Sequence, residues 1–274
     1  MRVWLLIALL FAGYGMVNML SKASSFGWLV AGAESGYDIN IVRWGGVVLQ
    51  LLLFIMPALV FANVFPQERF GFFRLGEKVK PLFILLGVMA LILILPGLNW
   101  LGDLSYKAIS DPDLKAMEDM NAKNDLWMDA IPNIQTLFFC IFVNALIPAV
   151  CEELFFRACL QQTLKEWTKH RHVSIILTSM FFAMIHFSPA GFAPIFIAGM
   201  MLGYAFDLTG SLRINIAMHF FFNATSLVID YLNQHSKAVA DWKEPVWFDV
   251  TGLIIGLGIF MLMIIRIQKV GSRP

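Results

Sequence analysis

The chain has 274 residues, of which 59% are hydrophobic and only 14% are charged. A soluble domain of this length would carry about a quarter charged residues, so the composition is typical of an integral membrane protein. The 20 basic and 19 acidic side chains nearly cancel, which leaves no charge excess for binding nucleic acid. The three cysteines, Cys140, Cys151 and Cys159, lie in apolar stretches. They are expected to be small buried side chains, not a disulfide framework.

Eight apolar stretches approach the length that crosses a bilayer core, which takes roughly 20 helical residues. They predict an all-α fold, a bundle of about eight transmembrane helices forming one domain over residues 1–274. The first is interpreted as a retained span, because it is long for a secretory signal and seven more follow. The stretches run from Val3 to Leu20, Trp44 to Phe65, Leu82 to Leu101, Ile134 to Leu160, Val173 to Phe187, Phe192 to Leu208, Ile214 to Leu232 and Val246 to Ile267.

The distribution of basic residues predicts the orientation of the chain, because Lys and Arg are retained on the cytoplasmic side of a membrane. Alternate connections, with both termini in one set, contain thirteen basic residues against seven in the other set. Both termini are therefore expected in the cytoplasm of a multi-pass protein of the cell membrane. The segment 102–133 has seven acidic residues and three lysines, and is expected outside as a polar, partly helical excursion.

The fifth and sixth stretches are short, and only the turn from Ser188 to Gly191 separates them. Irregular backbone at membrane depth is tolerated only inside protein or beside a water-filled cavity. The hairpin therefore predicts a cavity near His186, which immediately precedes the turn.

The fourth stretch contains Glu152, Glu153 and Arg157 within an otherwise apolar run. Glu153 and Arg157 are one helical turn apart, so an ion pair between them is expected. Glu152 points about 100° away and has no local partner, which makes it the better candidate for chemistry. It can meet His186 only if the fourth helix continues past Gln161, and we expect that longer helix.

Two further apolar helices carry polar groups that a membrane penalises. His186 ends the fifth stretch, and His219 and Asn223 lie one turn apart in the seventh. Hydrolysis of an amide needs a base to activate water, donors for the oxyanion and an acid for the leaving amine. Glu152 with His186 would activate the water, and His219 with Asn223 would bind the oxyanion.

Plainer interpretations exist for each group. A single intramembrane His or Asn, such as Asn144, is often an interhelical hydrogen-bonding group, and a Glu–Arg pair can lie at the membrane interface. The chain has no His-Glu-x-x-His motif. A zinc site built from Glu152, His186 and His219 remains open, because two His and one Glu can hold catalytic zinc.

Three motifs lie in order within residues 130–230 and resemble those of the CAAX protease and bacteriocin-processing family (CPBP or Abi family). This family of intramembrane glutamate proteases includes the Ras-converting CAAX prenyl endopeptidases. The motifs are Glu152-Glu153-x-x-x-Arg157, Phe182-x-x-x-His186 and His219-x-x-x-Asn223.

The resemblance implies an eight-helix bundle around a conical cavity, and proteolysis without an obligatory metal or other cofactor. It assigns water activation to Glu152 and His186 and the oxyanion to His219 and Asn223. Glu153, Arg157 and Phe182 would support the site. The spans before Ile131 add only a compatible topology.

We therefore expect a membrane endopeptidase whose site opens toward the cytoplasm. Its partners would be membrane lipids and a peptide or protein substrate, with a lipidated substrate as one option. The alternatives are a non-catalytic membrane adaptor or bacteriocin-immunity protein, and a zinc-dependent version of the same protease.

Overall fold

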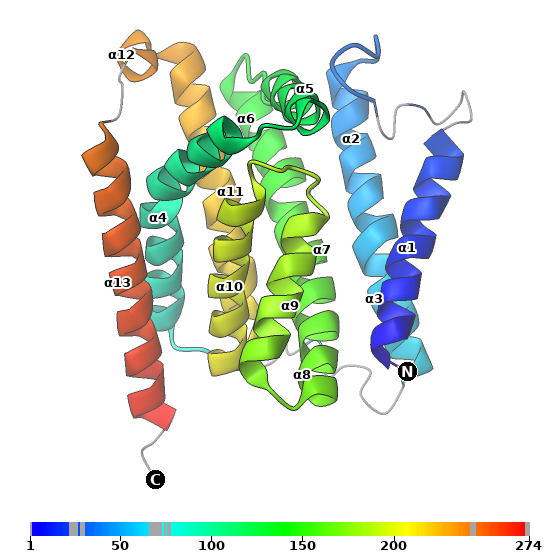
Figure 1. The fold of residues 1–274 in the computed structure, drawn as a ribbon, viewed down its shortest axis with the longest axis vertical. Coiled ribbons are helices and arrows are strands. Elements are labelled where there is room, and N and C mark those ends of the chain that lie inside the picture. The colour runs from blue at the N-terminus through cyan, green and yellow to red at the C-terminus, as the bar shows by residue number, and fades with distance from the viewer. Residues whose placement is uncertain are drawn as a thin grey trace.

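The computed structural model describes residues 2–21, 27, 31–65, 73, 75, 78–241 and 245–271. All the secondary-structure elements of these residues are helices, and most of them run along the vertical axis of Figure 1. The elements are α1 Arg2–Ser21, α2 Ile39–Gln50, η2 Leu51–Ile55, α3 Met56–Val64, α4 Pro81–Ala108, α5 Pro112–Met128, α6 Ile134–Cys140, η4 Ile141–Leu146, α7 Ile147–Glu153, η5 Leu154–Gln161, α8 Gln162–Thr168, α9 Arg171–Met184, α10 Phe192–Thr209, α11 Leu212–His235, α12 Lys237–Ala240 and α13 Val246–Gly271.

The apolar helices of the described residues correspond to the predicted membrane stretches. Two shorter ones, Arg2–Val17 and Arg171–Met184, coincide with the first and fifth stretches. Six are long and apolar enough to cross a membrane: Ile39–Val64, Pro81–Ala108, Ile134–Thr168, Phe192–Thr209, Leu212–His235 and Val246–Lys269. The prediction of an all-α polytopic membrane protein is confirmed.

Both chain ends lie at one end of the bundle, and α5 and α12 lie at the opposite end (Figure 1). This arrangement is compatible with termini on the same side of a membrane, and their cytoplasmic location stays a prediction. The count of Lys and Arg in the segments between spans wrongly included Arg157. This residue is fully buried inside the bundle and lies in no connecting segment. Five other counted residues lie outside the described part of the chain: Lys22, Arg69, Arg74, Lys243 and Arg273.

The fourth predicted span is one continuous helix from Ile134 to Thr168, which confirms the expected extension past Gln161. Its π-helical turn Ile141–Leu146 ends two residues before Pro148, and the turn Leu51–Ile55 ends two residues before Pro57. Proline lacks an N–H and its ring crowds the carbonyl four residues earlier, so a wider turn relieves the clash.

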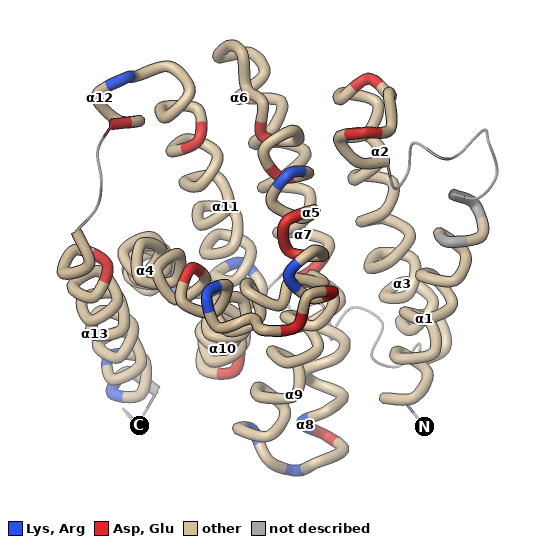
Figure 2. Tube along the Cα trace, turned by 45° about the horizontal axis from the view of Figure 1, so that its top comes forward, with Lys and Arg blue, Asp and Glu red and all other residues tan. Residues whose placement is uncertain are grey.

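Helix α5 is the partly helical polar excursion that the sequence predicted, and none of its residues is buried. Asp111 caps it by accepting hydrogen bonds from the backbone N–H groups of Asp113 and Leu114. Figure 2 shows acidic residues along this helix at the end of the bundle away from the termini. Its side chains bind the turn between α9 and α10: Asn121 donates to Phe187 O at 2.9 Å, and Ser188 Oγ donates to Glu118 at 2.8 Å.

The carboxyl of Asp129, just after α5, gives the fold a pH dependence. Burial, followed by repulsion from Asp230 and Asp125, raises the pKa of Asp129 from 3.8 to about 6. The folded state therefore binds the proton more tightly than the unfolded state, and this contribution to stability is lost as the pH rises from about 4 to above 6. We expect Asp129→Asn to raise the melting temperature in detergent at pH 7.5 and to leave it unchanged at pH 3.5.

The exposed Asp103 near the end of α4 offers a control for this prediction. Asp103→Asn should give the same melting temperature as the unsubstituted protein at both pH values. An Asp129→Asn protein that melts lower than wild type at pH 7.5 would contradict the assignment.

Helices α4 and α13 come into close contact at Gly256 of α13, which has no side chain to hold them apart. A Cβ added at Gly256 would lie 2.8 Å from Ala90 O and from the backbone nitrogen of Ile94, whereas one added at Gly258 meets nothing within 4 Å. Overpacking typically costs about 1–3 kcal/mol, and alanine is the better helix former by about 0.5–1 kcal/mol. We expect Gly256→Ala to lower the melting temperature and Gly258→Ala to hold or raise it, and equal values would contradict the packing role.

The Gly199 and Gly203 spacing in α10 also serves packing, as the sequence indicated. A Cβ at Gly203 would lie 2.8 Å from Ile175 Cγ2, and one at Gly199 would lie 3.3 Å from Ser179 Cβ. Both neighbours belong to α9, so the two helices of the hairpin that carries His186 are in close contact.

Candidate active site

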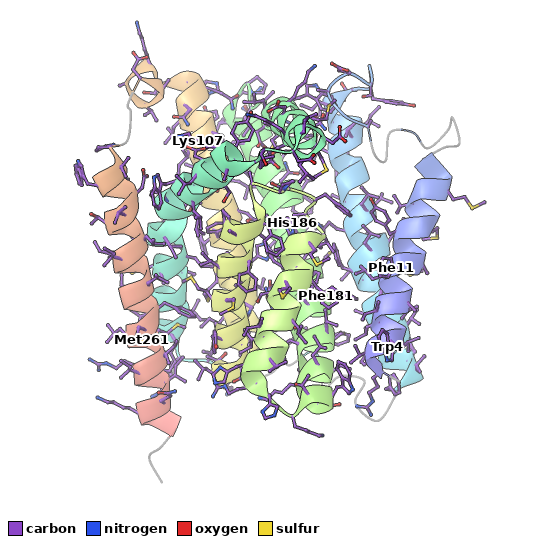
Figure 3. The ribbon with its side chains drawn as sticks, viewed as in Figure 1. Trp4, Phe11, Lys107, Phe181, His186 and Met261 are labelled. Carbon is purple, nitrogen blue, oxygen red and sulfur yellow. The ribbon has the colours of Figure 1, made fainter. Side chains whose placement is uncertain are left out.

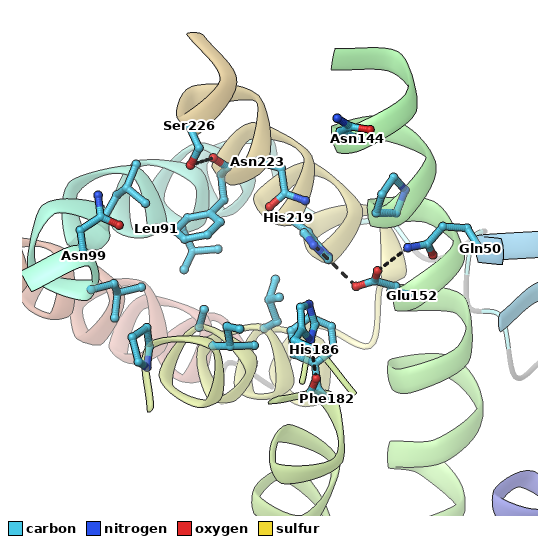
Figure 4. A pocket seen from close by; sticks show the side chains of 18 residues that line it. Gln50, Leu91, Asn99, Asn144, Glu152, Phe182, His186, His219, Asn223 and Ser226 are labelled. Carbon is cyan, nitrogen blue, oxygen red and sulfur yellow. Dashed lines mark hydrogen bonds and ion pairs between the residues drawn. The ribbon is translucent and has the colours of Figure 1, made fainter. Parts of the chain in front are cut away.

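A cavity of about 430 Å³ lies among α2, α4, α9, α10, α11 and the long helix Ile134–Thr168. Glu152, His186, His219 and Asn223, which the sequence predicted to act together, all line it (Figure 4). The wall is completed by polar and apolar groups: Gln50, Leu91, Leu95, Leu98, Asn99, Asn144, Pro148, Phe182, Pro194, Ile195, Ala198, Leu202, Phe222 and Ser226.

The cavity lies near the middle of the bundle, because its lining residues fall on both sides of the midpoints of α4, α10, α11 and the long helix. Glu153 and Arg157, beside it in the long helix, are fully buried. The expected opening of the site toward the cytoplasm stays a prediction.

Glu152 is buried, with 5% of its surface exposed, and its two carboxylate oxygens have different surroundings. Gln50 Nε2 donates a hydrogen bond to Oε1 at 2.7 Å. Oε2 lies 3.9 Å from His219 Nε2 and has no hydrogen-bond partner among the described residues. The second oxygen is therefore the one that can accept a proton from a molecule in the cavity.

Glu153 is fully buried and joins a buried network. Arg157 Nε donates to Oε2 at 2.9 Å, which is the predicted one-turn ion pair, and Asn215 Nδ2 donates to the same oxygen at 3.1 Å. His219 Nδ1 lies 3.1 Å from Oε1. An ionised carboxylate only accepts, so Nδ1 carries the proton and the other ring nitrogen of His219 faces Glu152.

His186 lies in the turn that follows α9, where its imidazole is held by the backbone. Its Nδ1 is 2.7 Å from Phe182 O. A carbonyl oxygen only accepts hydrogen bonds, so Nδ1 carries the proton and Nε2 of the neutral ring has a free lone pair. His186 is thus oriented as a base.

The residue after His186 has a strained backbone. Phe187 has φ of 50°, in the left-handed region that residues with side chains seldom adopt. Asn121 of α5 donates to its carbonyl oxygen, and its ring stacks on Tyr14 of α1 with centroids 5.6 Å apart. These contacts hold the turn, and strain of this kind is often found at functional sites.

Phe182 is the aromatic support that the sequence predicted. Its ring lies edge-on to His186, with centroids 4.9 Å apart, and to His219, at 5.9 Å. The guanidinium carbon of Arg157 lies 5.1 Å from the centroid of the same ring. Phe182 therefore contacts both histidines and the buried cation, and fixes their relative positions.

The sequence interpretation missed several polar residues of the cavity region. Gln50 and Asn99 come from spans to which it gave no part in the site, and Asn144, interpreted as purely interhelical, lines the cavity. Two signals were available: Gln50 is the single polar side chain between Arg43 and Asn63, and Asn215 lies one turn before His219.

The described residues contain no group of three or more His, Cys, Asp or Glu side chains close enough to hold a metal ion. Of the predicted zinc set, His219 already binds Glu153 through one nitrogen. All three cysteines are buried and free, as the sequence predicted.

The fold and the site together define a polytopic membrane protein with carboxylate and imidazole groups around a cavity between its helices. Residues 134–225, about a third of the chain, match a family model described as Rce1-like, type II CAAX prenyl endopeptidase Rce1-like. A search of curated proteins and a search of solved structures each give no significant match. The matched segment contains all three motifs, which confirms their resemblance to the CAAX protease and bacteriocin-processing family.

Proposed function

We propose that this protein is an intramembrane endopeptidase of the CAAX prenyl protease type. One observation carries the proposal: side chains from the long helix, the α9 turn and α11 line the same cavity, and two of them present basic atoms to it. Within the described part of the chain, Glu152 Oε2 has no hydrogen-bond partner, and the Nδ1 contact of His186 with Phe182 O leaves Nε2 as the nitrogen that can act as a base. The matched family supports peptides as the substrate class.

In the proposed reaction, a water molecule in the cavity gives a proton to Glu152 Oε2, with His186 Nε2 accepting a hydrogen bond from the same water. The hydroxide oxygen forms a bond to the peptide carbonyl carbon, and the carbonyl oxygen becomes an oxyanion. The C–N bond then breaks, and the proton held by Glu152 passes to the leaving nitrogen, as general acid and base catalysis requires.

Asn223 would donate to the oxyanion through its carboxamide, and His219 through Nε2. Because Glu153 binds the proton on Nδ1, Nε2 can donate only when His219 is protonated. The proposal therefore requires an imidazolium at His219, flanked by Glu152 and Glu153. Donors fixed in this way before the reaction cost no reorganisation in the transition state.

The position of the cavity bears on how substrate enters. With both termini in the cytoplasm, as the basic residues predict, the α5 end of the bundle would face the outer side (Figure 1). A peptide approaching from the α5 side would then meet Asn99, Asn144 and Ser226 before Glu152. Accessibility of a single cysteine placed at Asp113 to a membrane-impermeant reagent in intact cells tests this orientation.

The activity is tested by incubating the purified protein in detergent with a library of fluorogenic peptides, with and without a prenylated cysteine. Cleavage of at least one peptide is expected. Absence of cleavage in every pool, with the protein folded, would favour a non-catalytic adaptor or immunity protein. Cleavage that a chelator removes and zinc restores would favour the zinc-dependent protease.

A further inference from the structure

Gln50 of α2 is a polar residue in a place where the membrane penalises polarity. It is the single polar side chain between Arg43 and Asn63, in the apolar segment Ile39–Val64. It lies outside the segment 134–225 that matches the family model. A carboxamide at such a position needs hydrogen-bond partners inside the protein.

The partner of Gln50 is the candidate base. Its Nε2 donates to Glu152 Oε1 at 2.7 Å, across 102 positions of sequence. Its own Oε1 is buried and has no hydrogen-bond partner among the described residues. Both Gln50 and Glu152 line the cavity, and Figure 4 shows the carboxamide pointing at the carboxylate.

Donation to one oxygen makes the two oxygens of Glu152 chemically different. Oε1 is occupied by the amide N–H, while Oε2 faces the cavity on the side of His219. The contact therefore leaves Oε2 as the oxygen that can accept a proton in the cavity.

The backbone at the end of α2 helps to explain why the Gln50 side chain can reach Glu152. The π-helical turn Leu51–Ile55 starts directly after it, and such turns are common at functional sites. Phe54, within this turn, packs on Phe155 and Phe156 with ring centroids 5.8 and 5.6 Å apart. These aromatic contacts fix α2 against the long helix just beyond Glu152.

We infer that Gln50 is a positioning residue of the catalytic base: it holds Glu152 in the rotamer in which Oε2 takes the proton of water. This inference rests on the proposed function and extends it to the part of the chain that the family match does not cover.

The test measures the pH profile of peptide cleavage for Gln50→Leu and Gln50→Asn, using a peptide that the wild type cleaves. Gln50→Asn keeps the carboxamide and shortens the side chain by one methylene, so its N–H group no longer reaches Glu152 Oε1. For both variants we expect kcat to fall about 10- to 100-fold, in keeping with the loss of a hydrogen bond to a charged group. KM should stay within about twofold of the wild-type value.

The acidic limb of the profile should also shift, because Glu152 loses the hydrogen-bond donor on Oε1. The other titratable groups around Glu152, namely His219, His186 and Glu153, keep their contacts and set the rest of the profile. A merely structural role for Gln50 would lower the fraction of folded protein without moving this limb.

Asn63 on the same segment provides the matched control, since its Nδ2 binds Leu59 O and lies away from the cavity. Asn63→Leu should leave kcat and the pH profile unchanged. Wild-type kcat and profile in Gln50→Asn would overturn the role of Gln50 while the proteolysis stands. A wild type that cleaves no peptide would overturn the proposed function and this role together.

Discussion

Glu152→Gln should abolish peptide cleavage while the protein inserts and folds as before. The substitution keeps the shape of the side chain and removes the oxygen that accepts the proton of water. A positioned general base contributes typically about 10²- to 10⁴-fold to a rate, so the expected kcat is lower by roughly three orders of magnitude. The measurement is single-turnover cleavage of the best peptide at the pH optimum.

Glu166 on the same helix supplies the control for this experiment. Its carboxylate is half exposed and forms a surface ion pair with Arg2 at 3.0 Å, and such pairs contribute little to stability. Glu166→Gln should cleave at the wild-type rate. Cleavage at the wild-type rate by Glu152→Gln would remove the central support for the proposed mechanism.

Much of this architecture is predictable from periodicity and composition, since the membrane stretches are mostly apolar and are bounded by charged or turn residues. The Glu153–Arg157 ion pair is equally predictable from the sequence, because its geometry depends only on the helical repeat. The convergence of Glu152, His186, His219 and Asn223 on one cavity depends on tertiary packing. The family motifs made it predictable.

The remaining parts of the site could not be derived in this way. Gln50 and Asn99 reach the cavity from helices whose rotation about their axes is set by packing, and by the π-helical turn in the case of Gln50. Apolar residues surround each of them, so no amphipathic face indicates a direction. The depth of the cavity in the bundle could not be predicted either, because it depends on how far into each helix the facing polar residues lie.

Loss of the Glu153 carboxylate should have the largest effect on stability. Glu153 and Arg157 are each fully buried, and Arg157 Nη1 and Nη2 have no hydrogen-bond partner among the described residues. Glu153→Leu would therefore leave the guanidinium of Arg157 beside the Phe182 ring without its ion-pair partner. Breaking a buried pair by removing one partner costs about 3–5 kcal/mol.

For a chain of this size, that cost corresponds to a fall of roughly 6–20 °C in the melting temperature, measured in detergent. The double variant Glu153→Leu/Arg157→Met removes both charges, and replacing a whole buried pair with apolar groups is often close to neutral. We expect it to melt well above Glu153→Leu alone. Both variants should be inactive, because His219 loses the carboxylate that binds Nδ1.

Separate outcomes for stability and activity make this pair of variants informative. A double variant that regains stability without regaining cleavage shows that Glu153 orients His219 in addition to neutralising Arg157. A double variant that melts no higher than Glu153→Leu would contradict the view that an unpaired Arg157 is the source of the instability. The matched control is Glu166→Leu, which breaks an exposed ion pair on the same helix and should shift the melting temperature by only about 2–4 °C or less.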